Sequence, residues 1–252
     1  MNPDNYVEII DFINNADDSF FWSPFTDTEL PEFNKLIIDV ESSIKSNNKQ
    51  LKGNSLETLM TFIYSKFNFA EVESNVILNG NQFDHIITFN DFFRPALIKE
   101  HLGNKIICES KNHKDSISVR DVADLNELLR RNKCSTGIFS SIKTFSRRGK
   151  NMWTLGEGKR RKMFLSDETI ILGFTLKELK SLETNNFYTL LKQKYNCLFH
   201  ETNDDFGFEK ATVPFNQNLH TSLCQLHNAG VITSNEFSRH EKLLIEKFGD
   251  IQ

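Results

Sequence analysis

The sequence has little of what marks membrane and secreted proteins. Nothing in it approaches about 18 consecutive apolar residues, so we expect no membrane-spanning helix. The first ten residues, MNPDNYVEII, are acidic rather than basic and hold no long apolar run, so we expect no signal peptide. No internal repeat is evident. These absences favour a cytoplasmic protein without a membrane partner.

Cysteine is also sparse. The four cysteines, at positions 108, 134, 197 and 224, are widely spaced, with no Cys-x-x-Cys pair and no zinc-ligand spacing. This pattern favours free thiols in a reducing compartment over a disulfide framework. The sequence shows no zinc finger, helix-turn-helix or RNA-binding aromatic signature, so it gives no basis for inferring whether bases are read specifically.

The composition is that of a soluble globular protein. A length of 252 residues is enough for one good-sized domain with appendages and a substantial core. Charged residues make up 25% of the chain. The net charge of −4 does not by itself indicate a polyanionic partner, so the distribution of charge matters more than its sum.

The spacing of apolar residues predicts an α/β domain. An amphipathic helix is expected over 55–67 with Ser55 as its N-cap, followed by a hairpin over 71–89 that turns at NGN. A strand over 104–112, a helix over 119–133 and a strand over 134–141 follow. The order helix, strand, strand, strand, helix, strand predicts a mixed sheet flanked by helices.

Outside this core, the N-terminal part is expected to be mainly helical, with a polar linker over 45–55. A strand is expected in 163–174 and helices in 175–195. We therefore divide the chain into a helical N-terminal extension, a central α/β domain and a C-terminal helical hairpin. Their expected ranges are 1–52, 53–200 and 215–252.

Two of the expected strands carry charges in their middles. Asp84 lies within NQFDHIITF, and Glu109 and Lys111 lie two apart within IICESK, where alternation puts them on one face. If the strands are neighbours, Asp84 and Glu109 converge, and two close carboxylates repel unless a cation lies between them. Oxygen ligands favour Mg²⁺ or Mn²⁺ over zinc. Lys111 would lie beside that metal, where it can hold a phosphate oxygen or help deprotonate a water.

Glu57 extends this cluster. It lies on the preceding helix next to the apolar stripe, so a helix packed on the sheet could direct it toward the same cation, directly or through water. Taken alone, Glu-x-Lys is common and usually belongs to a solvated strand face. The full order of helix with Glu57, hairpin with Asp84, strand with Glu109 and Lys111, helix and strand is more specific.

That order resembles the PD-(D/E)xK restriction-endonuclease-like superfamily, and within it the Mrr-like restriction-type domains. The resemblance covers roughly residues 53–180 and rests on KGNSLETLM, NQFDHI, IICESKN and the helix and strand that follow. It implies a metal-dependent DNA endonuclease with Asp84, Glu109 and the backbone carbonyl of Ser110 as metal ligands. Lys111 would be the catalytic lysine and Glu57 an accessory acid. One departure is that Phe83 stands where the family name has proline.

A basic segment follows the candidate site. Within 143–162 the only acidic residue is Glu157, and the glycines there would let a backbone approach a phosphate. Clusters of this kind contact phosphates, although a solvated loop is the simpler interpretation. The residues expected to contact DNA are Lys143, Arg147, Arg148, Lys150, Lys159, Arg160 and Arg161.

The C-terminal segment has regular helical signals. Leu223 and Leu226 fit a first helix ended by Gly230, and Thr233 with Glu236 fits a capping box that opens a second helix. The pattern resembles the short C-terminal module abbreviated SHOCT, which implies a role in oligomerisation or interaction. An ordinary helical cap on the α/β domain is the alternative, because so small a hairpin must dock on something.

The sequence thus predicts an Mg²⁺- or Mn²⁺-dependent endodeoxyribonuclease, and the resemblance suggests restriction or antiviral defence. A dimer or higher homo-oligomer would suit cleavage of both strands. Three alternatives stay open: a nuclease for RNA or branched DNA, a degenerate nucleic-acid-binding module, and an effector gated by a partner or ligand through residues 1–50.

Overall fold

The computed structural model describes residues 16–46, 48–78, 80–91, 94–201, 220, 223–224, 227 and 232–248. The chain divides into two compact units, residues 1–205 and residues 206–252, which are treated separately below. The first 15 residues of the N-terminal part that was expected to be helical, and most of the first helix of the C-terminal hairpin, lie outside the described residues. Within the part described, no helix is both long and apolar enough to cross a membrane.

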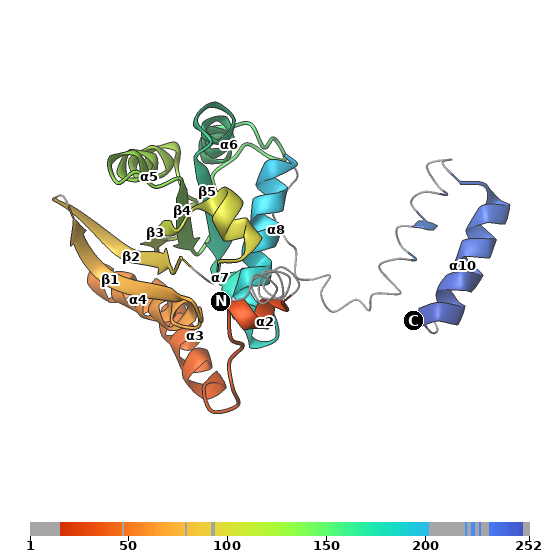
Figure 1. The fold of residues 1–252 in the computed structure, drawn as a ribbon, viewed down its shortest axis with the longest axis horizontal. Coiled ribbons are helices and arrows are strands. Elements are labelled where there is room, and N and C mark those ends of the chain that lie inside the picture. Colours follow the sequence, from red (N-terminus) through yellow and green to blue (C-terminus); the bar gives the residue numbers. More distant parts are fainter. Residues whose placement is uncertain are drawn as a thin grey trace, which may run out of the picture. The chain divides into compact units, whose positions relative to one another are not determined.

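The first unit is built on a five-stranded mixed sheet (Figure 1), which confirms the predicted α/β class. The strand order is β1-β2-β3-β4-β5, in which β1 to β3 run antiparallel and β3 to β5 run parallel. The strands span Ala70–Leu78, Asn81–Phe89, Lys105–Lys111, Thr136–Ser141 and Ile170–Thr175. The expected hairpin is therefore β1 and β2, and the strand with Glu109 is the middle strand, β3.

Helices cover both faces of the sheet (Figure 1). One face packs against α5 and α6 through a buried cluster that includes Ile107 and Phe139. The opposite face, to which His85 and Ser140 point, packs against α4 and α8. The helical elements of this unit are α2 (Asp18–Phe21), α3 (Leu30–Lys45), α4 (Lys49–Tyr64), a π-helix η1 (Ile98–Leu102), α5 (Val119–Arg131), α6 (Leu155–Asp167), α7 (Leu176–Lys180), a 3-10 helix η2 (Ser181–Glu183) and α8 (Phe187–Phe199).

Helix α5 forms where local signals and packing agree. Ser118 caps its first turn in a capping box with Asp121, and Val122, Leu125 and Leu129 are buried against the sheet. Gly137 on β4 lies under this helix, where an added Cβ would come within 2.8 Å of Leu125. The predicted helix is thus confirmed, and the glycine allows it to lie close to the sheet.

Three expectations for local structure were wrong. The expected linker over 45–55 is mostly helical, because α3 ends at Lys45 and α4 begins at Lys49. Ser55 is therefore inside α4 rather than at its N-cap, and its hydroxyl donates to the carbonyl of Lys52. Helix α4 also crosses the expected domain boundary at 52. The start of the strand expected over 163–174 is the end of α6, and the strand itself begins at Ile170.

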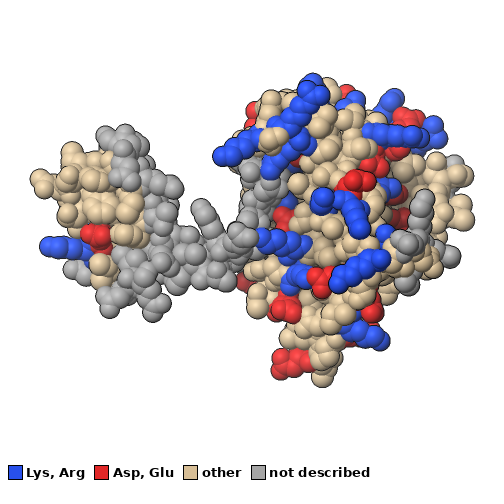
Figure 2. Space-filling model, turned by 180° about the vertical axis from the view of Figure 1, so that it is seen from behind, with Lys and Arg blue, Asp and Glu red and all other residues tan. Residues whose placement is uncertain are grey.

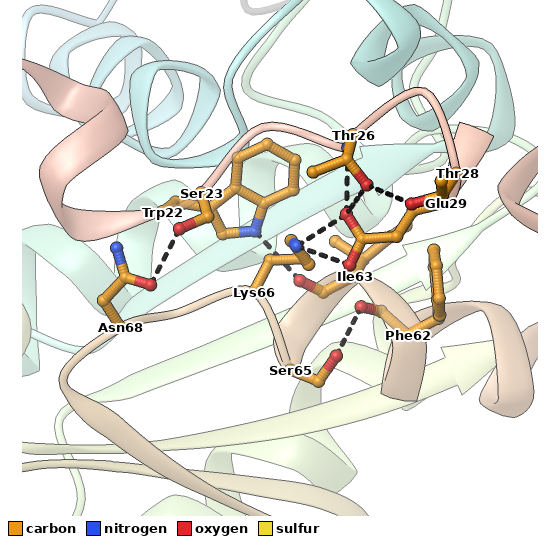
Figure 3. A network of polar contacts seen from close by, with 10 residues as sticks. All are labelled: Trp22, Ser23, Thr26, Thr28, Glu29, Phe62, Ile63, Ser65, Lys66 and Asn68. Atoms are coloured by element: carbon orange, nitrogen blue, oxygen red, sulfur yellow. Dashed lines mark hydrogen bonds and ion pairs between the residues drawn. The ribbon is translucent and has the colours of Figure 1, made fainter.

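Residues 22–29, which precede α3, contact the end of α4 and the turn that follows it (Figure 3). The Trp22 indole is buried and donates to the carbonyl of Ile63 at 2.9 Å. Lys66 lies 2.8 Å from Oε1 of Glu29, and the Ser23 hydroxyl donates to Asn68 at 2.8 Å. The described part of the N-terminal extension is therefore packed into the first unit.

In the second unit, α10 spans Ser234–Phe248. The predicted capping box is confirmed: Thr233 donates through its backbone and its hydroxyl to Glu236, at 2.8 and 2.9 Å, and the Glu236 N–H returns a bond of 3.3 Å. Leu244 is buried, whereas Leu243 and Ile245 are 49% and 37% exposed. This helix therefore exposes two apolar side chains.

Candidate active site

Strands β2 and β3 bring Asp84 and Glu109 to the same place. The two strands pair antiparallel with His85 opposite Cys108, so one step further along this register sets Asp84 opposite Glu109. The backbone N–H of Ser110 donates to Oδ2 of Asp84 at 2.6 Å, which fixes that carboxylate against β3. Lys111 Nζ lies 3.4 Å from Oε2 of Glu109. The structure therefore brings together the three residues that the sequence analysis singled out from two separate strands.

Burial makes these carboxylates harder to ionise. Burial and the neighbouring charge of Asp84 raise the pKa of Glu109 to about 7, against the opposing effect of Lys111. Burial also raises the pKa of Asp84, although the hydrogen bond from Ser110 opposes that rise. Three acids and one lysine thus share a partly desolvated space, because Glu57 also acts on Glu109.

Glu57 reaches this cluster from α4. Burial and the charge of Asp84 raise its pKa, which shows that the two carboxylates act on each other. Glu57 also lines an open groove of about 580 Å³ between α3, α4 and β1, together with Thr58 and Asn75. The helix therefore places Glu57 between the carboxylates of the sheet and a solvent-open groove.

The two residues next to Asp84 on β2, Phe83 and His85, pack inside the fold. His85 points away from Asp84 toward α4, where its Nε2 lies 2.8 Å from the Thr61 hydroxyl. Burial lowers the pKa of His85 to about 4, so the ring is neutral near pH 7. Phe83, at the position of the family's proline, is fully buried. Neither side chain takes part in the charged cluster.

The donor set fits a hard divalent cation. It consists of the carboxylates of Asp84, Glu109 and Glu57 and nearby backbone carbonyls, and such oxygen donors suit Mg²⁺ or Mn²⁺. Among the residues that the structure describes, no group of three or more His, Cys, Asp or Glu side chains already stands in metal-binding geometry. Asp84 accepts a hydrogen bond from the Ser110 N–H, and Glu109 pairs with Lys111.

A comparison with protein families matches this same part of the chain. Residues 49–160 match the family model Mrr_cat, described as restriction endonuclease. This segment is therefore similar to restriction-endonuclease domains of the Mrr type. A search of curated proteins returns no match. The matched range runs from α4 into α6, so it contains Glu57, Asp84, Glu109 and Lys111, and it confirms the resemblance inferred for the central domain.

Only some of the basic side chains in residues 143–162 are exposed to solvent. Lys143, Arg148 and Lys150 are exposed, and Arg147 and Lys159 are partly exposed. On the face shown in Figure 2, Lys and Arg side chains form separate groups with Asp and Glu between them. These five residues can meet a phosphate backbone, and they lie on or close to the loop that follows β4.

Arg160 and Arg161 require a correction. Both were expected to contact DNA, but they are 0% and 2% exposed within α6. Both bind the buried carboxylate of Glu157, at 2.8 and 2.6 Å. The Arg160 guanidinium also donates to the carbonyl of Ile171 and lies 4.6 Å from the ring centre of Phe145. These two arginines therefore hold α6 to the core and do not form a phosphate-binding surface.

The sequence analysis missed one residue beside the site. Asn112 follows Lys111 directly and is buried, with its side chain directed to α3 and α4. The only local signal was a polar residue at the end of an apolar strand, which also fits an exposed strand end. Its packing depends on helices distant in sequence, so spacing alone could not reveal it.

Proposed function

We propose that this protein is a divalent-metal-dependent endonuclease that hydrolyses phosphodiester bonds in DNA. The observation that carries the proposal is the convergence of Asp84, Glu109 and Lys111 inside a restriction-endonuclease domain. Asp84, Glu109 and the Ser110 carbonyl would hold Mg²⁺ or Mn²⁺. When bound, the cation would supply an activated water and charge stabilisation at phosphorus.

The chain's own residues supply the remaining requirements. The Lys111 side chain is 31% exposed, so its ammonium can reach a phosphate oxygen while it stays beside Glu109. Glu57 borders both the carboxylates and the open groove, where it can orient a water or accept a proton. Lys143, Arg147, Arg148, Lys150 and Lys159 would hold the DNA backbone through phosphate contacts.

We further propose that the protein acts in restriction or antiviral defence and associates through its C-terminal hairpin. The family match supports the defence role. The exposed Leu243 and Ile245 support association with a second copy, which would supply the second active site needed to cut both strands. The buried site and its intact acids favour this function over a degenerate binding module.

Plasmid cleavage tests the proposal. The purified chain is incubated with supercoiled plasmid and Mg²⁺ or Mn²⁺ beside Asp84→Ala and Lys111→Ala. We expect cleavage by the parent, loss of at least about 100-fold in both variants, and no cleavage in EDTA. A variant with both Arg148→Ala and Lys150→Ala should retain the chemistry but bind DNA more weakly, with a flatter salt dependence.

The same assay separates the alternatives. Cleavage that survives in both Asp84→Ala and Lys111→Ala would reject the assigned site. Cleavage of RNA or branched DNA in preference to plasmid would favour the second substrate class. A parent that cuts neither DNA nor RNA under any of these conditions would contradict the proposal and favour a gated or binding protein.

A further inference from the structure

A buried amide directly follows the lysine of the site. Asn112 is 8% exposed and is the first residue after β3. Its Nδ2 lies 3.0 Å from Ser43 Oγ, 2.5 Å from the carbonyl of Lys52 and 3.2 Å from Ser55 Oγ. One side chain at the end of the catalytic strand therefore contacts α3 and α4 together.

The two serines complete a polar cluster inside the fold. Ser55 Oγ lies 2.8 Å from Ser43 Oγ and 3.0 Å from the carbonyl of Lys52, and the buried Ser43 hydroxyl donates to the carbonyl of Val40 at 2.7 Å. Buried polar groups are costly unless they are paired, and removing one partner leaves the other unsatisfied. Three acceptors around one amide nitrogen therefore fix the orientation of Asn112, whose Oδ1 has no protein partner among the residues described.

The cluster joins the elements that carry the proposed site. Ser55 lies two residues before Glu57 on α4, and Asn112 lies one residue after Lys111 on β3. A helix moves as a rigid body, so contacts in the early turns of α4 also set the place of Glu57. Ser43 belongs to α3, which lies outside the matched range 49–160, so this chain adds its own element to the family's domain.

We propose that Asn112 is a positioning residue of the nuclease site. Its side-chain amide clamps the end of β3 to α3 and α4 and so holds Lys111 and Glu57 at a fixed separation. A misplacement of about 1 Å at reacting groups can cost roughly 100-fold in rate. The inference rests on the proposed nuclease function, and it assigns α3 of the N-terminal extension a part in catalysis.

The test compares Asn112→Ala with a matched asparagine. Asn132 is a half-buried residue at the end of α5 whose Nδ2 donates to the carbonyl of Leu128 at 2.8 Å, and its Oδ1 is likewise unpaired within the described part of the chain. Both alanine variants lose a side-chain amide bond to a backbone carbonyl. Only Asn112→Ala loosens the end of β3.

Four quantities are measured in the full-length chain: Mn²⁺ binding by electron paramagnetic resonance, kcat and KM for plasmid cleavage, and Tm. We expect Asn112→Ala to lower kcat by about 10–100-fold and weaken Mn²⁺ binding by about 10-fold. KM for plasmid should change by less than about twofold, because the DNA-contacting residues lie elsewhere. Asn132→Ala should lower Tm but leave kcat and Mn²⁺ binding as in the parent.

The outcomes separate this inference from the function on which it rests. A folded Asn112→Ala that binds Mn²⁺ and cleaves like the parent overturns the inference, as does an equal loss in Asn132→Ala. Should Asn112→Ala fail to fold, Ser43→Ala removes one acceptor and must show a smaller loss of kcat in the same direction. A parent that neither binds Mn²⁺ nor cleaves would reject the proposed function, and this inference with it.

Discussion

Burial and two neighbouring carboxylates all raise the pKa of Glu109. Its pKa is raised to about 7 by burial first, then by Asp84, with a further contribution from Glu57. A pair of charged carboxylates held this close destabilises the metal-free fold. The site is therefore expected to favour either protonation or a cation, which is the behaviour that a metal-dependent hydrolase needs at neutral pH.

This gives a prediction for stability without metal. Between pH 4.5, the ordinary pKa of Glu109, and pH 7, the folded chain keeps a proton that the unfolded chain has lost. Unfolding free energy must therefore fall as pH rises through this window, by at most roughly 3 kcal/mol from this residue. Glu109→Gln in EDTA should lose much of that fall and be more stable than the parent near pH 8.

Urea unfolding at pH 5, 6, 7 and 8 measures the effect. Glu127→Gln is the control, because that carboxylate lies on the exposed side of α5. The burial of Glu57 and Asp84 acts in the same direction, so some dependence on pH should persist in Glu109→Gln. A parent whose stability is flat or rises between pH 5 and 7 would contradict the assigned environment of Glu109.

At the scale of elements, α5 and α6 show what the sequence can and cannot predict. Helix α5 was predictable because a capping box and an apolar stripe both signal it locally. In α6, Glu157, Arg160 and Arg161 have the three- and four-residue spacing of an exposed helical ion pair. They are nevertheless buried, and Arg160 packs on the ring of Phe145, which lies outside the helix. Sequence predicts charge and spacing, whereas tertiary packing decides which charges water reaches.

The same reasoning applies to the site. Asp84, Glu109 and Lys111 were predictable because strand alternation places Glu109 and Lys111 on one face, and the pairing of β2 with β3 brings Asp84 beside them. Asn112 was not, since its partners Ser43 and Ser55 come from helices whose packing no local pattern specifies. The start of α4 was also missed, because polar residues at its first turns resemble a linker.

Helix α6 allows a comparison of two ion-pair clusters with the same spacing. Glu157 pairs with residues three and four positions later inside the fold, and Glu127 pairs with Arg130 and Arg131 at those spacings on the surface. We expect Glu157→Ala to destabilise the protein by about 3–5 kcal/mol, because it leaves two buried guanidinium groups without their shared carboxylate. Glu127→Ala should cost less than about 1 kcal/mol.

Urea unfolding of both variants at neutral pH measures this difference. Glu157→Ala should also show a lower Tm, while DNA binding should change only as far as the folded fraction changes. Equal losses of stability in the two variants would contradict a buried role for Glu157. A selective loss of DNA affinity in fully folded Glu157→Ala would instead restore α6 as part of the binding surface.

For the whole molecule, the division into two units matches the two parts of the proposed function, cleavage and association. The first unit holds the complete acid and lysine cluster together with the described part of the N-terminal extension. The second unit holds α10 with its capping box and exposed leucine and isoleucine. Under the proposed function, the first unit would suffice to cleave one strand, whereas two copies of it would be needed to cleave both strands at one place.

Association through α10 is therefore testable by two measurements: the mass of the protein in solution and the ratio of nicked to linear plasmid. We expect the parent to exceed the monomer mass in light scattering, and the double variant Leu243→Glu, Ile245→Glu to be monomeric, because each substitution places a charge on the proposed apolar contact. The variant should still nick plasmid but make fewer linear molecules. Ile38→Glu is the control, since Ile38 is 58% exposed on α3 of the other unit and should leave mass and product ratio unchanged. A parent that is monomeric at all concentrations would remove the association proposal and leave the nuclease proposal standing.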